Sequence, residues 1–258
     1  MRTDYIKKRL HGEVFALRNK ELSSLIDFVN NDALSAIDYK GADPKSVNYE
    51  VIENTAIISI DGAMAKKSYT GLCESVFGYN EIISMLQKAE SDPNIEKVIS
   101  VVDSPGGAVS GVAQLHDVIS NISKPTITYY DNLGASAAIW GFIGSDKIYA
   151  SPTTLIGSIG VMAIVSKETE EGTTVLTSAG AENKVCSSED ECMAKIQSRI
   201  NGYENKFYEA IQSSREGFDP ETIRSVFNNG DVIFADEAAW NGFIDGVMSI
   251  RELFNKEI

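Results

Sequence analysis

Short apolar runs alternate with segments of helical periodicity from residue 55 onward. The run Thr55 to Ile60 reads T-A-I-I-S-I, a β-branched pattern that suits a buried strand. Further strands are predicted at 98–102, 126–130, 147–150, 155–165, 173–177 and 231–234. Helices are predicted at 79–89, 111–122, 189–214 and 235–241, with shorter ones starting at Ser136 and Pro220. This alternation predicts an α/β fold with a parallel central sheet and crossover helices.

The first fifty residues differ from the rest of the chain. Leu22, Leu25, Ile26 and Val29 recur at helical spacing, so we expect an irregular arm that holds one amphipathic helix. The arm carries eight acidic and eight basic side chains, whereas the whole chain has a net charge of −14. We therefore divide the chain into an N-terminal arm and linker, 1–50, and a core domain, 51–258. The weakly patterned residues 65–79 are expected to form a long loop.

Composition excludes several classes of function. A net charge of −14 argues against nucleic-acid and anionic-membrane partners, which need clustered Lys and Arg. The sequence contains no apolar run long enough to span a membrane and no secretory signal, so a cytoplasmic location is expected. The three cysteines, Cys73, Cys186 and Cys192, favour reduced thiols and lack the spacing of a zinc site. No metal or other cofactor is expected.

Two predicted strands of the sheet each run into a turn that leads to a helix. The first turn is Asp103-Ser104-Pro105-Gly106-Gly107, and its glycines leave backbone N–H groups unshielded, as an oxyanion hole requires. The second is Gly134-Ala135-Ser136, where Ser136 is a candidate nucleophile. Each turn alone is equally compatible with plain packing. Ligands of open α/β sheets bind outside the carboxyl ends of the strands, so the coincidence of the two turns favours a site.

A serine nucleophile needs a base, and the sequence limits the choice. The chain has two histidines, His11 in the arm and His116 within a predicted helix, and neither follows Ser136. A lysine remains, provided that burial lowers its pKa from about 10.4. Lys184 lies in a turn after the last core strand, while most lysines of any protein are solvated surface residues. From the residues alone the base stays open.

Three motifs in series resemble those of the signal peptide peptidase A family of serine peptidases. They are the 103–107 turn, Gly134-Ala135-Ser136-Ala137-Ala138, and Gly157-Ser158-Ile159-Gly160-Val161, and the resemblance covers roughly residues 50 to 250. Within that family the chain looks most like the phage head maturation (capsid) proteases. The resemblance implies a ClpP/crotonase-like fold and a Ser/Lys dyad.

The resemblance also assigns roles to individual residues. It implies Ser136 as nucleophile, Lys184 as general base and Ser158 as the serine that orients the lysine. The N–H of Gly107, next to Gly106, is implied as an oxyanion donor. Because the segment before Lys184 departs from the common family pattern, Lys195 and Lys167 are alternatives for the base. The long helical pattern 189–214 carries a wide apolar stripe that predicts core packing or a homo-oligomeric contact.

The implied function is a serine endopeptidase that cleaves phage capsid or scaffold proteins during head maturation, in the host cytoplasm or the procapsid. One alternative is a bacterial signal-peptide-degrading peptidase, although such proteins usually carry a membrane anchor. Another is a crotonase-type acyl-CoA enzyme, and a third is a non-catalytic procapsid assembly protein. The capsid protease and the signal-peptide-degrading peptidase both act on a protein or peptide substrate.

Overall fold

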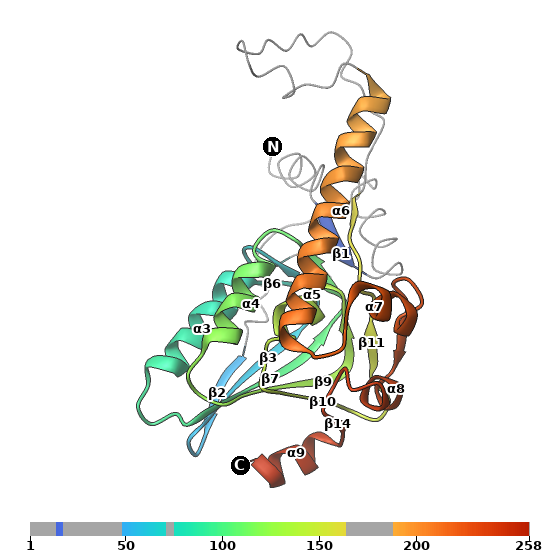
Figure 1. Ribbon diagram of the computed structural model, residues 1–258. Coiled ribbons are helices and arrows are strands. Elements are labelled where there is room, and N and C mark those ends of the chain that lie inside the picture. The colour runs from blue at the N-terminus through green and yellow to red at the C-terminus, as the bar shows by residue number, and fades with distance from the viewer. Residues whose placement is uncertain (1–13, 18–47, 71–74, 164–187, 258) are drawn as a thin grey trace, which may run out of the picture.

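The protein is described here from a computed structural model that covers residues 14–17, 48–70, 75–163 and 188–257 (Figure 1). The amphipathic helix predicted within residues 22–29, the strand at 173–177 and the loop around Lys184 lie outside these described residues. None of the described helices is long and apolar enough to cross a membrane.

The central sheet has the strand order β13-β11-β9-β7-β3-β2, and its interior pairs are parallel. Its strands are β2 (Asn48–Ile52), β3 (Thr55–Asp61), β7 (Lys97–Ser104), β9 (Thr126–Ala135), β11 (Leu155–Gly157) and β13 (Val232–Phe234). The first half of β9 also pairs with β10 (Lys147–Ala150), which in turn pairs with β14 (Gly246–Val247). The apolar runs read from the sequence thus form a mostly parallel sheet, as predicted.

Helices cover both faces of this sheet (Figure 1). On one face lie α3 (Tyr79–Ser91), α4 (Val112–Asn121) and α5 (Ala137–Phe142), whose buried side chains share one cluster with the strands. On the other face α9 (Ile250–Glu257) places Leu253 against Ile99, Ile127 and Tyr129. Successive strand residues point to opposite faces, so a sheet buried on both sides needs the continuous apolar runs that the sequence shows.

A second, smaller sheet lies beside the first and has the order β12-β1-β8-β4-β6-β5. Its strands are β1 (Val14–Leu17), β4 (Met64–Ala65), β5 (Tyr69–Thr70), β6 (Ser75–Gly78), β8 (Gly106–Ala108) and β12 (Met162–Ala163). The prediction of one long loop over 65–79 was therefore wrong, because strands of two to four residues are too short to show a period-two pattern. The sheet also includes four residues of the N-terminal arm.

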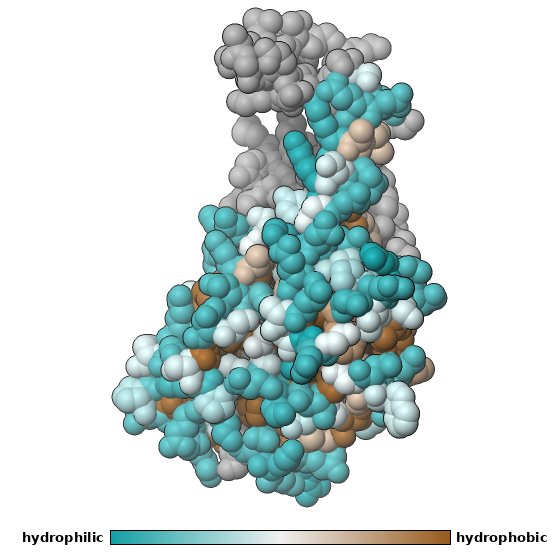
Figure 2. All heavy atoms as spheres, viewed as in Figure 1, coloured by the Kyte–Doolittle hydropathy of each residue, from teal (hydrophilic) through white to brown (hydrophobic). Residues whose placement is uncertain are grey.

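The long helix α6 (Glu189–Ser214) has the predicted bounds. Ser188 caps its start, since the Ser188 hydroxyl accepts a hydrogen bond from the Glu191 N–H at 3.2 Å. Only the carboxyl-terminal half of the predicted apolar stripe is core: Phe207, Tyr208 and Ile211 are buried, whereas Tyr203 is 39% exposed. The other half of α6 projects from the body, and Figure 2 shows a mostly hydrophilic surface there.

The chain ends in a compact group of short elements, α7 (Pro220–Val226), β13, α8 (Ala235–Trp240), β14 and α9. Asp219 caps α7 by accepting a hydrogen bond from the Thr222 N–H, and Pro220 occupies the first turn, where its missing N–H costs nothing. One further expectation fails at the start of α6, where Cys192 is disulfide-bonded, so the prediction of reduced thiols was wrong for this residue.

Aromatic stacking joins the projecting helix to the core. Trp140 of α5 lies over Phe207 of α6 with ring centroids 5.0 Å apart and planes 10° from parallel. Trp140 is 2% exposed. The short helix α5 is thereby held from one side by α6 and from the other by the sheet.

The two tryptophans of the chain offer a matched test of this packing. Trp140→Ala is expected to lower the free energy of unfolding by about 3–5 kcal/mol, because it empties a buried stacked site. Trp240→Ala is expected to change it by less than about 0.5 kcal/mol, since Trp240 is 90% exposed. Denaturant unfolding of both variants measures the difference. Equal losses would contradict the burial described for Trp140.

Candidate active site

Ser136 stands at the junction of β9 and α5, at the carboxyl edge of the sheet. Its N–H donates to the Gly157 carbonyl at 2.8 Å, and its own carbonyl accepts from the Trp140 N–H at 3.0 Å. The first bond fastens Ser136 to the neighbouring strand β11, and the second fastens it to the first turn of α5. The backbone of the candidate nucleophile is therefore fixed from two elements.

The backbone conformation of Ser136 is unusual. Its φ is 55° and its ψ is −117°, a region that residues with a β-carbon rarely adopt. A sharp strand-to-helix turn of this kind is the structural context in which a catalytic serine is commonly held above a sheet. Strain of this type costs about 1–3 kcal/mol and persists only where the surrounding structure imposes it.

The Ser136 hydroxyl is the most informative polar group of the site. Ser136 is 1% exposed, and among the described residues its Oγ has no hydrogen-bond partner. A buried hydroxyl without a partner costs about 1–3 kcal/mol, which native proteins rarely leave uncompensated. The local fold thus holds, at the carboxyl edge of the sheet, a buried hydroxyl that no described residue pairs with.

The structure brings Ser158 next to Ser136. In the β9–β11 ladder Ala135 pairs with Gly157, so the two serines occupy equivalent positions just after neighbouring parallel strands. Ser158 has a φ of 53° and donates its N–H to the Asp231 carbonyl at 2.8 Å. Gly157 has no room for a side chain, because a β-carbon there would lie 2.5 Å from that same carbonyl. The pairing of β9 with β11 therefore places the 157–161 motif beside the 134–138 motif.

The 103–107 motif lies beside the 134–138 motif because of an irregularity in the β7–β9 ladder. After Val102 pairs with Tyr130, the next paired residues are Ser104 and Gly134, so β9 carries extra residues between them. Such bulges are frequent beside active sites, where they re-aim the strand. Here the bulge sets the start of the paired-glycine segment opposite the start of the serine turn.

The paired glycines do not lie at a helix start, which corrects the sequence interpretation. Gly106 and Gly107 belong to strand β8, and α4 begins only at Val112, after Gly111. Gly107 pairs with Met64 of β4 so closely that a β-carbon would lie 1.8 Å from the Met64 carbonyl oxygen. The glycine is required by strand packing, and any oxyanion donor here is a strand amide without a helix dipole behind it.

Ser104 has a structural role that the sequence did not predict. It is fully buried, and its Oγ accepts a hydrogen bond from the Gly106 N–H at 3.2 Å. Gly106 has a φ of 105°, so this bond stabilises the turn into β8. The Gly106 N–H is thus already used within the turn. Its place in the first motif was the only sequence signal for Ser104.

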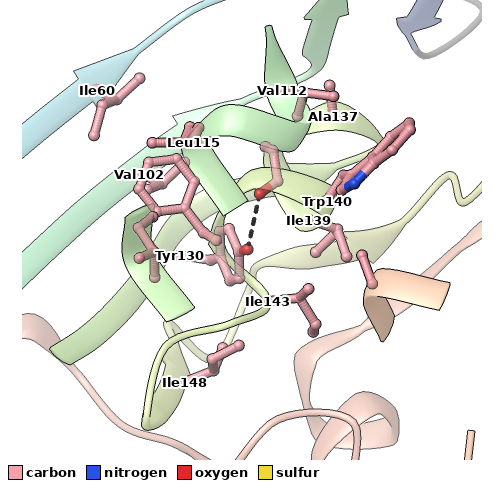
Figure 3. Close-up of a cluster of buried hydrophobic side chains, with 14 of the residues drawn as sticks. Ile60, Val102, Val112, Leu115, Tyr130, Ala137, Ile139, Trp140, Ile143 and Ile148 are labelled. Carbon is pink, nitrogen blue, oxygen red and sulfur yellow. Dashed lines mark hydrogen bonds between the residues drawn. The ribbon is translucent and has the colours of Figure 1, made fainter. Parts of the chain in front are cut away.

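The helix that follows Ser136 is anchored by a buried tyrosine. The Tyr130 hydroxyl donates to the Ala138 carbonyl at 3.2 Å, and the ring lies among apolar side chains of α4 and α5 (Figure 3). At the start of α3, the Tyr79 hydroxyl donates to the Ala108 carbonyl of β8 at 2.9 Å. Burial raises the pKa of both tyrosines, so both hydroxyls remain protonated donors. These bonds hold α5 and β8 in place.

The candidate bases lie in different parts of the chain, and not all of them are among the described residues. Lys184 and Lys167 lie outside the described residues. Lys195 lies on α6, and its Nζ is 2.6 Å from a carboxylate oxygen of Glu191, one turn earlier on the same helix. His116 packs on α4, and burial lowers the pKa of its imidazole; its Nδ1 has no hydrogen-bond partner among the described residues. Lys195 is thus engaged in an ion pair on its own helix, and the burial of His116 agrees with a packing role.

Comparison with known proteins places this geometry in a family. Residues 119–257 match the model of peptidase family S49, and residues 51–156 match that of Clp protease. A ClpP1 variant from Listeria monocytogenes shares the fold, with a TM-score of 0.52 and 18% identity over 76% of this chain and 92% of that chain. The fold predicted from the three motifs is therefore confirmed as ClpP-like.

Curated relatives point the same way. The capsid assembly protease C of Escherichia phage lambda is 30% identical over 157 residues, which is 55% of this chain and 35% of that protein. A protein of Enterococcus faecium described as a signal peptide peptidase, SppA, is 26% identical over 74% of this chain and 58% of its own length. The chain thus spans less than two thirds of these relatives. Because the family model covers more than half of the chain and the three motifs converge, the chain belongs to peptidase family S49.

Proposed function

We propose that this protein is a serine endopeptidase in which Ser136 is the nucleophile and Lys184 the general base. The observation that carries the proposal is the Ser136 hydroxyl, which is buried, has no hydrogen-bond partner among the described residues and sits on a strained strand-to-helix turn. Two neighbouring elements support the proposed roles of Ser158 and Gly107. Ser158 follows the adjacent strand, and β8, with Gly107, packs against α5.

The proposed reaction passes through an acyl-enzyme. Lys184 takes the Ser136 proton while Oγ attacks the carbonyl carbon of the scissile peptide bond, and the Gly107 N–H donates to the oxyanion that forms. The amine leaves with a proton returned by the lysine. Water then attacks the ester carbonyl with the lysine again as base, which releases the second product and restores the serine. Ser158 is proposed to hold the lysine amine toward Ser136.

The substrate is proposed to be a capsid or scaffold protein of a phage. Support comes from the phage lambda relative, whose name assigns it to capsid assembly. A signal-peptide substrate is the alternative, favoured by the SppA relative. Co-expression with candidate capsid and scaffold proteins, followed by mapping of the new termini, decides between them. New termini in the structural proteins support the first, and termini confined to signal peptides support the second.

Covalent labelling tests the nucleophile independently of any substrate. A fluorophosphonate probe is expected to add one label to the protein, located at Ser136 by peptide mass spectrometry. A buried but unstrained serine such as Ser145 serves as an internal comparison, because its hydroxyl is already paired with Thr128 at 2.7 Å. The absence of any label on Ser136 would support a non-catalytic assembly protein instead.

Replacement of the base gives a paired prediction. Lys184→Ala is expected to lower kcat by at least about 10³-fold, because an unactivated serine hydroxyl is a weak nucleophile at neutral pH. Lys195→Ala is the matched control and should leave kcat within about twofold of the parent. Peptide hydrolysis by both variants is the measurement. Full activity of Lys184→Ala would eliminate the dyad.

The pH profile follows from the same assignment. Protonated lysine cannot accept the serine proton, so kcat/KM should fall about tenfold per pH unit on the acid side of the lysine pKa. The activity is therefore expected to be full at alkaline pH and to be lost as the pH falls. A rate that stays flat between about pH 6 and pH 9 contradicts a lysine base.

A further inference from the structure

The strand β1 (Val14–Leu17) is far from the rest of the described chain in sequence but lies inside the smaller sheet (Figure 1). It pairs antiparallel with β8 on one side, with Ala16 opposite Gly107 and Leu17 opposite Gly106. On the other side it pairs antiparallel with β12, with Phe15 opposite Met162. A four-residue segment of the arm thus bridges two strands that do not pair with each other.

The two neighbours of β1 define a slot for one extended chain. Adjacent strands lie about 4.8 Å apart, so β8 and β12 are about 10 Å apart with a single strand between them. Without β1, both would present unpaired N–H and C=O groups to each other across that gap. An extended peptide from any source can satisfy both rows at once, which is how peptides bind by strand addition. The backbone geometry of the slot does not depend on the sequence that fills it.

Both strands that line this slot, β8 and β12, lead to the candidate active site. β8 contains Gly107, the proposed oxyanion donor, and packs against α5, which starts immediately after Ser136. β12 begins four residues after Ser158, whose turn is joined to β9 beside Ser136. A peptide bound between β8 and β12 therefore runs past the proposed nucleophile and presents its backbone to the proposed oxyanion donor.

We propose that β1 is an internal pseudosubstrate, which occupies the slot that an extended substrate peptide takes and thereby inhibits the enzyme until it is displaced. The inference rests on the proposed peptidase function and adds its regulation. The segment reads V-F-A-L, an uncharged apolar stretch, and its small residue Ala16 lies opposite Gly107. The substrate class that fits the same slot is an extended apolar peptide segment with a small residue at this position.

The inhibition follows from the intramolecular connection. A tethered segment has an effective concentration of about millimolar, whereas a free substrate is present at far lower concentration. Displacement exchanges β1 backbone hydrogen bonds for equivalent bonds to the substrate, so the substrate gains little from the ladder itself. A protein that presents many copies of its cleavage segment, or holds one close by, competes best with β1.

Binding to an inactive variant tests the proposal without relying on hydrolysis. The probe is a fluorescent peptide with the sequence of residues 12–19, G-E-V-F-A-L-R-N. It is titrated into full-length Ser136→Ala protein and into the same protein with Ala16→Pro, and anisotropy is recorded. Proline cannot donate a backbone hydrogen bond, so Ala16→Pro should release β1 from the slot. The released protein is expected to bind the probe at least about tenfold more tightly.

Two controls separate strand release from other effects. Ala42→Pro makes the same chemical change in the arm outside β1 and should leave probe affinity at the parent value. A probe carrying proline in place of its alanine should fail to bind the released protein. Leu17→Pro, at the end of β1 where pairing involves β8 alone, provides a second releasing variant should Ala16→Pro fail to fold.

The outcomes are distinct. Equal probe affinity in the parent and in both releasing variants, or a loss of thermal stability in both without any gain in binding, would make β1 a permanent structural strand and overturn the proposal. Tight binding of the probe, together with no peptide hydrolysis by protein that keeps Ser136, would support the binding slot and refute the peptidase function instead. With active protein, Ala16→Pro should also lower KM for an added peptide while kcat stays unchanged.

Discussion

Ser136→Ala is expected to abolish peptide hydrolysis and to leave the fold as stable as before or more stable. The fall in kcat should reach at least about 10³-fold, because loss of a serine nucleophile removes the covalent route entirely. Stability should rise by up to about 1–3 kcal/mol, because the change removes a buried hydroxyl that has no hydrogen-bond partner among the described residues. Hydrolysis assays and denaturant unfolding of the same preparation measure both effects.

Ser145→Ala is the matched control for this prediction. Ser145 is also buried, but its Oγ is hydrogen-bonded to the Thr128 hydroxyl, so its removal leaves that hydroxyl unpaired. Here we expect a loss of about 1–3 kcal/mol in stability with unchanged kcat. A stability loss in Ser136→Ala as large as that in Ser145→Ala would show that the Ser136 hydroxyl is paired in solution.

Ser136→Gly separates backbone strain from the hydroxyl. Glycine adopts a φ of 55° and a ψ of −117° without a β-carbon clash, so the strain of about 1–3 kcal/mol should be relieved. We expect Ser136→Gly to be at least as stable as Ser136→Ala, despite the greater flexibility of glycine in the unfolded chain. A clearly less stable glycine variant would contradict a strained conformation at this position.

Gly107→Ala is expected to lower both the stability and the activity of the protein. The added β-carbon would meet three backbone atoms of Met64, with the carbonyl oxygen at 1.8 Å, and no side-chain rotation can relieve that contact. Strands β4 and β8 must therefore separate, which should cost about 1–3 kcal/mol of stability. Because the proposed oxyanion donor moves with β8, kcat should fall by about 10²-fold.

Gly202→Ala is the control for a glycine without such a neighbour. Gly202 lies within α6, and a β-carbon there would have nothing within 4 Å. Replacement should raise stability by about 0.5–1 kcal/mol, since alanine favours the helix, and should leave kcat unchanged. Normal kcat in a destabilised Gly107→Ala protein would remove Gly107 from the proposed oxyanion hole.

The sequence predicted the longer elements around the larger sheet, though not its strands β2 and β14, because the signals of longer elements are local. The apolar run at 55–60 and the helical period at 79–89 correspond to β3 and α3, and the 189–214 pattern has the bounds of α6. It failed where a strand is only two or three residues long, as in β4 and β5, because no periodicity fits such a length. The sequence also did not predict how much of α6 is buried. An apolar stripe shows which face of a helix makes contacts, but not how far along the helix those contacts extend.

The site was predicted in part. The serine turn pointed to Ser136, the absence of a suitably placed histidine pointed to a lysine base, and the structure shows that Ser136 and Ser158 follow adjacent strands. The paired glycines were placed at a helix start, whereas they form β8 within a second sheet. The support from Ser104 was missed, since a serine inside a turn motif carries no sign of what it will bond. The division of the chain at residue 50 remains a prediction.

By itself the sequence predicted the longer strands and helices and a candidate nucleophile, because hydrophobic period and residue chemistry are properties of short segments. Only the tertiary structure decided the burial of the hydroxyl and the strained backbone of Ser136, the close approach of Gly107 to Met64, and the place of β1 between β8 and β12. These features depend on pairing between segments tens of residues apart. That pairing is set by packing over the whole molecule, so no local pattern encodes it.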